Sequence, residues 1–400
     1  MKSSKNPKVL VAMSGGVDSS VAALMMKKAG YEVVGAFMKN WSDTKNSLGE
    51  CAWRDDRKMA LKVASMLGIP LITLDFEKQY KKEVVNEMFK DYSKGIVPNP
   101  DIDCNQKIKF PLLWKAARKI GADFIVTGHY ARIKQNKINK TTKSANSKAT
   151  HSSVNANNLT GVNKRIMDSN NLHYHYELLR AKDETKDQSY FLYRLSEENL
   201  SHTLFPIGNY TKKQIRKIAE KNKFPNFDRK GTVGICFIGK VNLKNFLQKK
   251  IKPKPGNILD PSGNLIGKHD GIYYYTIGQK VGPHFGIDID KGEGKQKRWY
   301  VAKKDLKTNT ITAAPEGHPL NFRKEMTLKN VHWTNQKPKN SMKVLARIRQ
   351  VGELLPSKLS YTNKKYNLVL DKQITGIAEG QAAVLYQGKK VLGGGVISFS

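Results

Sequence analysis

The first stretch with the residue types for chemistry is SGGVDS, residues 14–19, directly after the apolar run KVLVAM. Gly15 and Gly16 let the backbone turn tightly and bring its N–H groups against an anion. A helix expected from Val17 points its positive end at the same place. Ser14 and Ser19 add hydroxyl donors, and Asp18 offers a carboxylate to a metal ion. These residues in this order predict a phosphate site.

This stretch differs from two common nucleotide-binding motifs. It lacks the Lys–Ser/Thr pair of a P-loop, and it does not fit GxGxxG. GICFIGK, residues 234–240, matches the P-loop by letter, but its interior is bulky and Val241 stands where the magnesium-binding hydroxyl is needed. An ordinary strand–turn–helix junction is the alternative for residues 14–19, and the full string after an apolar strand favours the phosphate site.

The second source of chemistry is a set of three cysteines, Cys51, Cys104 and Cys236. They are too few and too far apart for a disulfide framework, and none forms a CxxC pair for zinc. Taken alone, each is more typical of a small buried side chain than of a nucleophile. VPNPDIDCNQKIKF, residues 97–110, is rich in Pro, so we expect a loop there, with Asp101 placed to move a proton beside Cys104. Cys236 is flanked by glycines and followed by Phe.

The elements that must position these residues alternate between strand and helix from residue 8 to about residue 131. Strands separated by helical stretches indicate βαβ units, so we expect an α/β fold with a mostly parallel, doubly wound sheet. Residues 134–173 consist mainly of Lys, Asn, Ser and Thr without aromatics, which predicts an exposed insertion. A helix is expected at TKKQIRKIAEKN, after the strand HYELLRA.

The remaining chain divides into two further parts. Residues 253–300 are rich in Gly and Pro, and short strands recur after Arg298, starting with WYVAKK and TITAA. That spacing predicts a small antiparallel barrel. We therefore expect a catalytic domain at 1–200, a small central domain at 201–297 that carries the Cys236 loop, and a β-barrel at 298–400.

Composition favours a nucleic-acid partner. The 400 residues contain 70 Lys and Arg against 34 Asp and Glu, a formal net charge of +36. Such a charge attracts polyanions, although lysines spread over every surface would give the same total. No apolar run approaches the about 20 residues that span a bilayer. With few cysteines and no signal-like N-terminus, the sequence predicts a cytoplasmic protein.

Several motifs together resemble a known family. SGGVDS resembles the PP-loop of the N-type ATP pyrophosphatases, which cleave ATP between its α- and β-phosphates. Taken with further motifs in one order, it resembles the tRNA-specific 2-thiouridylases nearly end to end, apart from residues 134–173. Those motifs are NPDIDCN, GHYAR (128–132), KDQSYFLY (186–193), LFPIGNYTKKQIR (204–216), GICFIG, YTIGQK (275–280) and the terminal LGGGVI.

The resemblance implies 2-thiolation of the wobble uridine in tRNAs for Lys, Glu and Gln. ATP, with Mg²⁺, adenylates the uridine 2-oxygen. Sulfur arrives as a persulfide on Cys236 from a cysteine desulfurase or sulfur-relay protein. The persulfide attacks the activated carbon directly, or Cys104 releases it as hydrosulfide. Either route leaves a Cys104–Cys236 disulfide that an external reductant resets.

The same resemblance implies roles for individual residues. Cys104, Cys236 and Asp101 would be catalytic. The residues expected to bind ATP are Ala12, Met13, Ser14, Gly15, Gly16, Val17, Asp18, Ser19, Met38 and Gly128. Those expected at the target base or tRNA are Asn99, Pro100, Asp101, Lys186, Asp187, Gln188, Arg347 and Ile348. No fixed metal site is implied, and Mg²⁺ would accompany ATP near Asp18.

The chain departs from the family pattern at two places. Gly231, Thr232 and Val233 stand where the family usually has an acidic residue, Ser and Thr, and Ile348 stands where we associate Tyr. Cys51 is expected to be structural. One alternative is an ATP-dependent amidating synthetase, whose chemistry would ignore Cys104 and Cys236. Another is a basic RNA-binding protein without nucleotide chemistry, which an intact SGGVDS disfavours.

Overall fold

The computed structural model describes residues 6–42, 51, 53–137, 174–229, 242–282, 289–290, 297–338 and 341–399. Most of the expected insertion and all of the segment around Cys236 therefore lie outside the described residues. The chain divides into two compact units. The first comprises Met1–Glu77, Asn105–Thr232 and Lys389–Val391, and the second comprises Lys78–Cys104, Val233–Gly388 and Leu392–Ser400.

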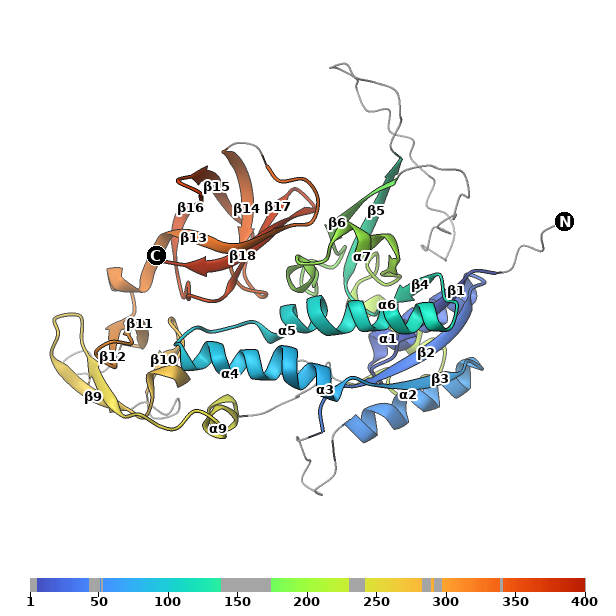
Figure 1. The fold of residues 1–400 in the computed structure, drawn as a ribbon, viewed down its shortest axis with the longest axis horizontal. Coiled ribbons are helices and arrows are strands. Elements are labelled where there is room, and N and C mark those ends of the chain that lie inside the picture. The colour runs from blue at the N-terminus through green and yellow to red at the C-terminus, as the bar shows by residue number, and fades with distance from the viewer. Residues whose placement is uncertain are drawn as a thin grey trace, which may run out of the picture. The chain divides into compact units, whose positions relative to one another are not determined.

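A five-stranded parallel sheet forms the centre of the first unit, which confirms the expected doubly wound class (Figure 1). Its strand order is β3-β2-β1-β4-β7. The strands are β1 (Lys8–Ala12), β2 (Glu32–Lys39), β3 (Leu71–Asp75), β4 (Phe124–Val126) and β7 (Thr203–Leu204). Their apolar residues run almost without interruption because both faces of the sheet are covered.

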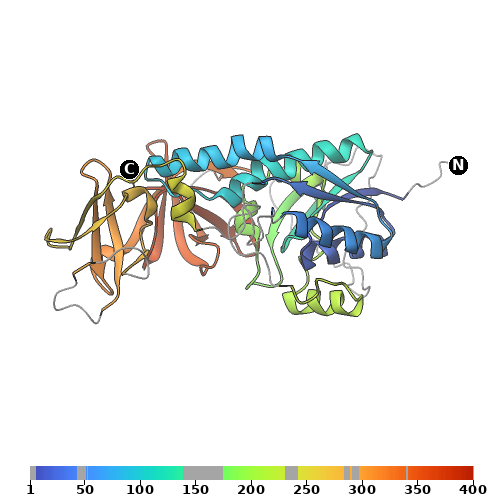
Figure 2. The ribbon, with the colours of Figure 1, turned by 90° about the horizontal axis from the view of Figure 1, so that it is seen from below.

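Helices cover both faces of this sheet, as Figure 2 shows. Val9 and Val11 of β1 join one buried cluster with residues of α1, α2 and α8, whereas Leu10 between them points to the opposite face. On that other face α6 contacts β1 and β4. The helices are α1 (Val17–Lys28), α2 (Trp53–Leu67), α6 (Phe110–Lys119) and α8 (Lys212–Lys221).

The strand order places the start of α1 at a special point of the sheet. From β1 the chain passes to β2 and β3 on one side, and later to β4 and β7 on the other. The carboxyl end of β1 is therefore the topological switch point, where ligands bind in open α/β sheets. Residues 13–16, which contain Gly15 and Gly16, follow directly at this point.

A hairpin and short helical segments complete the first unit. Strands β5 (Ala131–Lys137) and β6 (Tyr174–Arg180) pair antiparallel, and Leu179 also pairs with Lys390. The remaining helical segments are the 3-10 turn Ser189–Leu192 and α7 (Glu197–Ser201).

The second unit contains a mixed middle sheet and a closed antiparallel barrel, which confirms the expected barrel (Figure 1). The middle sheet has the order β10-β11-β12-β8-β9, and the barrel closes because β13 pairs with both β16 and β18. The middle strands are β8 (Gly256–Leu259), β9 (Leu265–His269), β10 (Lys280–Val281), β11 (Trp299–Asp305) and β12 (Thr310–Pro315). The barrel strands are β13 (Phe322–Trp333), β14 (Met342–Arg347), β15 (Leu355–Thr362), β16 (Lys365–Thr375), β17 (Ala382–Gln387) and β18 (Lys390–Ser398).

Two local expectations differ from the structure. WYVAKK and TITAA were expected in the barrel, but as β11 and β12 they pair within the middle sheet. Alternation shows that a strand exists but does not say which distant strand it joins. The loop expected through residues 97–110 is wrong for most of its length, because α5 (Pro100–Asp103) continues as a π-helical run, Cys104–Lys109. Asn99 and Pro100 are the N-cap and first residue of a helix, not a break.

Shorter helices complete the second unit. They are the π-helical run Lys81–Val85, α4 (Asn86–Ser93), α9 (Leu243–Gln248) and the 3-10 turns Ile272–Tyr274 and Pro319–Asn321; α3 (Glu77–Tyr80) lies where the first unit passes into the second. None of the helices in the described ranges is long and apolar enough to cross a membrane.

Candidate active site

The turn after β1 is built so that only glycine fits at its centre. Gly15 has φ +76°, and a Cβ atom there would lie 2.3 Å from the carbonyl oxygen of Asp56. Gly16 is the N-cap of α1 and contributes no side-chain cap. The first N–H groups of α1 are consequently not occupied by a capping side chain of Gly16, which suits the binding of an anion at this end of the helix.

Serine hydroxyls hold the shape of this turn. Ser19 Oγ accepts a hydrogen bond from the Ser14 N–H at 3.2 Å and donates one to the Gly16 carbonyl at 3.0 Å. Ser20 Oγ donates to the same carbonyl at 3.0 Å. The two serines thus fix the backbone of the glycine turn, a role in addition to the phosphate contact expected of Ser14 and Ser19.

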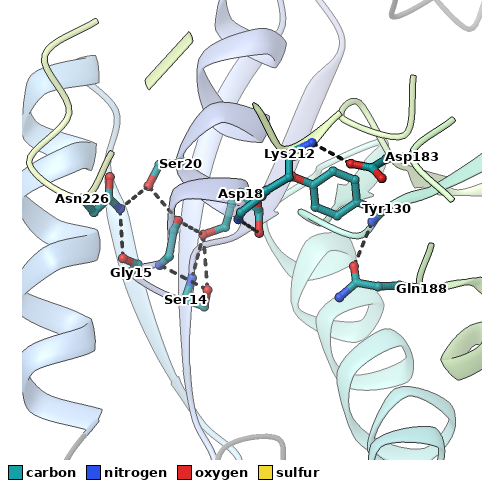
Figure 3. Close-up of polar contacts among 11 residues, drawn as sticks. Ser14, Gly15, Asp18, Ser20, Tyr130, Asp183, Gln188, Lys212 and Asn226 are labelled. Carbon is teal, nitrogen blue, oxygen red and sulfur yellow. Dashed lines mark hydrogen bonds and ion pairs between the residues drawn. The ribbon is translucent and has the colours of Figure 1, made fainter. Parts of the chain in front are cut away.

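Asp18, in the first turn of α1, is held by two side chains from distant parts of the chain (Figure 3). Lys212 Nζ lies 2.7 Å from both Asp18 oxygens, and the Tyr130 hydroxyl donates to Asp18 Oδ1 at 2.8 Å. Burial, then the Asp18 charge and hydrogen bond, raise the pKa of Tyr130 well above its usual range. Tyr130 is therefore a neutral donor throughout the physiological range.

The loop at residues 183–188 positions both partners of Asp18. Asp183 Oδ2 accepts from the Lys212 backbone N–H at 2.8 Å. Gln188 Oε1 accepts from the Tyr130 N–H at 2.8 Å, and the Gln188 N–H donates to the Tyr130 carbonyl at 2.8 Å. Figure 3 shows how Asp183 and Gln188 reach Lys212 and Tyr130 from this loop.

The same loop contains three residues expected to contact tRNA. Lys186 is exposed and Gln188 is half-buried. Asp187 is buried and accepts hydrogen bonds from the Ala181 N–H at 3.0 Å and the Ser189 hydroxyl at 3.0 Å. Of the three, Lys186 is the side chain presented to solvent, and Asp187 holds the loop together.

On its other side the glycine turn is tied to the segment after α8. Asn226 Nδ2 donates to the Gly15 carbonyl at 2.9 Å and to Ser20 Oγ at 3.0 Å (Figure 3). Arg229 donates to the Gly15 carbonyl at 3.3 Å and to the Asp56 carboxylate at 2.6 Å. Burial raises the pKa of Asp56, and the Arg229 cation only partly opposes this. In sequence, Arg229 precedes Cys236 by seven residues.

The other expected ATP residues lie around the same strand ends. Gly128 follows β4, and a Cβ atom there would approach the Ser19 backbone nitrogen to 2.7 Å, so the two segments touch. Met38 is a buried residue of β2, and Ala12, Met13 and Val17 flank the glycine turn. The structure therefore gathers the expected ATP residues at one edge of the parallel sheet.

His129, beside Gly128, was not named from the sequence. Its Nδ1 lies 2.7 Å from the Thr127 hydroxyl, and its ring stacks on Phe110 with centroids 5.9 Å apart. Burial first, and the Lys109 cation second, hold the pKa of His129 well below its usual value. A neutral His129 results.

The residues expected to handle sulfur are described only in part. Asn99 Oδ1 caps α5 by accepting from the Ile102 N–H at 3.3 Å. Asp101 and Cys104 are three residues apart in one helical run, a spacing that puts both on one helix face. Cys104 is fully buried and Asp101 half-buried. Cys236 lies outside the described residues. Cys51 Sγ donates to the Ser42 carbonyl at 3.1 Å.

The two expected tRNA residues of the barrel are buried. Arg347 ends β14 with 4% exposure, and its guanidinium lies 5.5 Å from the centroid of the Tyr386 ring. Ile348 is part of the barrel core. A buried Ile is consistent with a barrel interior and gives no polar contact of its own.

The described part of the chain holds no cluster of three His, Cys, Asp or Glu side chains able to bind a metal. A single carboxylate such as Asp18 nevertheless fits Mg²⁺ that arrives with phosphates, because this ion usually keeps several waters and takes only one or two protein carboxylates. Lys212, Tyr130, Asn226 and Arg229 complete the site and were missed from the sequence. Two of the quoted motifs gave a signal, since GHYAR contains Tyr130 and TKKQIR contains Lys212. Asn226 and Arg229 lie in none of the quoted motifs.

Comparisons with known proteins cover nearly the whole chain. Three family models match, described as the tRNA methyl transferase HUP domain (residues 7–240), the tRNA methyl transferase PRC-barrel domain (244–315) and the aminomethyltransferase beta-barrel domain (323–397).

Curated proteins match over the same length. The chain is 38% identical over 403 residues to "tRNA-specific 2-thiouridylase MnmA 2" of Aliarcobacter butzleri, covering 99% of each protein. It is 38% identical over 400 residues to an MnmA of Coxiella burnetii, covering 98% of this chain and 99% of the relative. An MnmA of Flavobacterium johnsoniae is 36% identical over 433 residues, covering 98% of this chain and all of the relative.

Proposed function

Because the chain belongs to the tRNA-specific 2-thiouridylase family, we propose that it is a tRNA sulfurtransferase that uses ATP to thiolate the wobble uridine of tRNAs for Lys, Glu and Gln at position 2. The observation that carries this proposal is the full-length match to 2-thiouridylases together with a glycine turn at the switch point of the parallel sheet. The family models are described by methyl transfer, but the named relatives are thiouridylases and a triphosphate site serves activation of an oxygen.

In the proposed first step, the uridine 2-oxygen attacks the α-phosphorus of ATP and pyrophosphate leaves. The backbone at Gly15 and Gly16 and the start of α1 hold phosphate oxygens. Asp18, in the first turn of α1, would hold Mg²⁺, and the ion would supply positive charge to the phosphates. The product is a 2-O-adenylated uridine, in which the oxygen departs with AMP when a nucleophile attacks carbon 2.

In the second step a persulfide on Cys236 supplies the sulfur. Its terminal sulfur bonds to carbon 2 as AMP leaves, and the Cys104 thiolate then attacks the inner sulfur and breaks the S–S bond. Alternatively, Cys104 attacks first and releases hydrosulfide, which reacts with carbon 2. Both routes end in a Cys104–Cys236 disulfide, which a dithiol reductant returns to two thiols. Asp101, one helical turn from Cys104, moves the proton.

tRNA binding rests on charge in this proposal. The net charge of +36 favours the phosphate backbone, so binding weakens as salt is raised. Asn99, Pro100 and Asp101 line the flipped-out base, and the exposed Lys186 contacts the tRNA backbone. Arg347 and Ile348 are buried in the barrel and would support the tRNA surface from beneath. Since both cysteines must start as thiols, the protein acts in a reducing compartment, the cytoplasm. A cysteine desulfurase or relay protein donates the sulfur.

Nucleoside analysis tests the proposal. Unmodified tRNA is incubated with the protein, ATP, Mg²⁺, a persulfide source and a dithiol, and 2-thiouridine is measured by mass spectrometry. We expect the product with wild type and with Cys51→Ala, and none with Cys236→Ala. No 2-thiouridine with wild type, or its formation by Cys236→Ala, contradicts the proposal.

The alternative of an amidating synthetase gives a different result in a parallel assay. Such an enzyme forms AMP and pyrophosphate with ammonia and a small acceptor, without tRNA, and Cys104→Ala and Cys236→Ala would not affect it.

A further inference from the structure

The glycine turn supplies no cation of its own, although it is expected to hold a polyanion. Residues 12–20 read AMSGGVDSS and contain no Lys or Arg. Backbone N–H groups and a helix end provide only partial charges, and a pyrophosphate carries several full negative charges. A full positive charge from another segment would complete the site.

Lys212 places that charge beside the turn. Its Nζ lies 2.7 Å from both oxygens of Asp18, which belongs to the first turn of α1 (Figure 3). The Lys212 side chain is 17% exposed and that of Asp18 is 30% exposed, so the pair is accessible to a ligand but held at the turn.

The backbone under Lys212 is fixed. Thr211 caps α8 through a capping box with Gln214, and Asp183 accepts from the Lys212 N–H. Ile215 and Ala219 of the same helix pack in the core that also contains α1. The four-carbon side chain of Lys212 can therefore change partner while its backbone stays in place.

We propose that Lys212 is a pyrophosphate-binding residue of this site, and that its ion pair with Asp18 is the nucleotide-free arrangement. On binding of Mg²⁺ with ATP, Asp18 takes the cation and Lys212 takes oxygens of the β- and γ-phosphates. Each charge exchanges one partner for another, so neither is left buried and unpaired. This inference rests on the proposed function only in taking ATP as the substrate.

Binding measurements test the assignment without thiolation. Dissociation constants for inorganic pyrophosphate and for AMP are measured by titration calorimetry, with and without Mg²⁺. The variant is Lys212→Met, and the matched control is Lys213→Met, because Lys213 is the next residue of the same helix, carries the same charge and is exposed. Circular dichroism verifies that each variant is folded.

We expect Lys212→Met to weaken pyrophosphate binding at least tenfold, with AMP and Lys213→Met near wild type. If Lys212 served only to neutralise Asp18, its removal would leave pyrophosphate affinity with Mg²⁺ unchanged or higher, and that result overturns the proposal.

A second variant, Asp18→Asn, is expected to change the affinity for pyrophosphate in the opposite direction. In EDTA, Asp18→Asn releases Lys212 from its partner, so metal-free pyrophosphate should bind more tightly than to wild type. In the double variant Asp18→Asn with Lys212→Met this gain should disappear. A gain that survives in the double variant contradicts the proposal. Normal pyrophosphate binding without any thiolation would instead refute the function and leave Lys212 assigned.

Discussion

The glycine turn at Gly15 and Gly16 and the segment Asn99–Cys104 are assembled in different ways. Around the turn, the groups that reach Asp18 and Gly15 come from Tyr130, Lys212 and Asn226, which are 112, 194 and 211 residues away. In the second region the capping Asn99, Asp101 and Cys104 lie within two turns of one helical run. One site depends on tertiary folding, whereas the other is set by sequence spacing.

This difference decides how each region should respond to substitution. A change in the Asn99–Cys104 run removes one group from the proposed chemistry but leaves its neighbours on the helix. A change around the glycine turn disturbs a backbone that several distant segments hold together. The predictions below separate the two kinds of effect by measuring pyrophosphate release and thiolation independently.

The largest effect is expected for Asp101→Asn. Removing a positioned acid–base group lowers the single-turnover thiolation rate by about 100-fold to 10,000-fold, while ATP binding in the other region remains normal. Asp103→Asn is the control. Asp103 belongs to the same helix but lies two residues after Asp101, so its side chain faces another direction. Equal loss in both variants would mean that the helix, not the carboxyl of Asp101, was damaged.

Gly15→Ala tests whether the glycine turn depends on its close packing against Asp56. The added Cβ meets the Asp56 carbonyl oxygen at 2.3 Å, so the backbone must shift. A displacement of about 1 Å in a reacting geometry costs about 100-fold in rate, here in pyrophosphate release. Gly30→Ala is the matched control, since Gly30 has φ +82° and a Cβ there meets nothing within 4 Å. A wild-type rate of pyrophosphate release by Gly15→Ala would contradict the claim that the turn has no room for a Cβ atom at residue 15.

Tyr130→Phe removes one hydrogen bond to Asp18 and leaves the Lys212 pair. Because hydrogen bonds to charged groups are among the stronger ones, its removal should lower the affinity for Mg²⁺ with ATP about tenfold. KM for ATP and kcat are measured separately, and we expect KM to rise while kcat stays near its wild-type value. The pKa of Tyr130 is raised far above neutrality, so this loss should not vary between pH 6 and about 8. A loss that appears only at one end of this range contradicts the role of Tyr130 as a neutral donor.

The smallest effect concerns Lys304, which ties Gly95, four residues before Asn99, to the middle sheet. Its Nζ donates to the carbonyls of Gly95 at 3.1 Å and Tyr275 at 2.8 Å. Burial lowers the pKa of Lys304 from 10.5 to about 8. The unfolded chain therefore binds more protons than the folded one between these pH values, so stability gains with rising pH in that window.

Lys304→Met should remove this gain, a slope of about 1 kcal/mol per pH unit, as measured by urea unfolding from pH 8 to 10. Lys303→Met, at the exposed neighbouring position, should keep the wild-type slope. Identical slopes in wild type and Lys304→Met would show that Lys304 is not buried as described.

The sequence predicted the parallel sheet, the glycine turn and the barrel because each has a local pattern. It did not predict the partners of Asp18, since no spacing links residue 18 to residue 212. The loop predicted for residues 97–110 was wrong, because Asn99 and Pro100 begin a helix. Strands β11 and β12 were recognised as strands, but their sheet is decided by pairing with β8 and β10 far along the chain.

The fate of the uridine oxygen tests the central claim most directly. tRNA carrying ¹⁸O at position 2 of the wobble uridine is thiolated in a single turnover, and AMP is analysed by mass spectrometry. If ATP activates that oxygen, AMP gains one ¹⁸O for each 2-thiouridine formed. Thiolated tRNA together with AMP that lacks ¹⁸O would contradict the account.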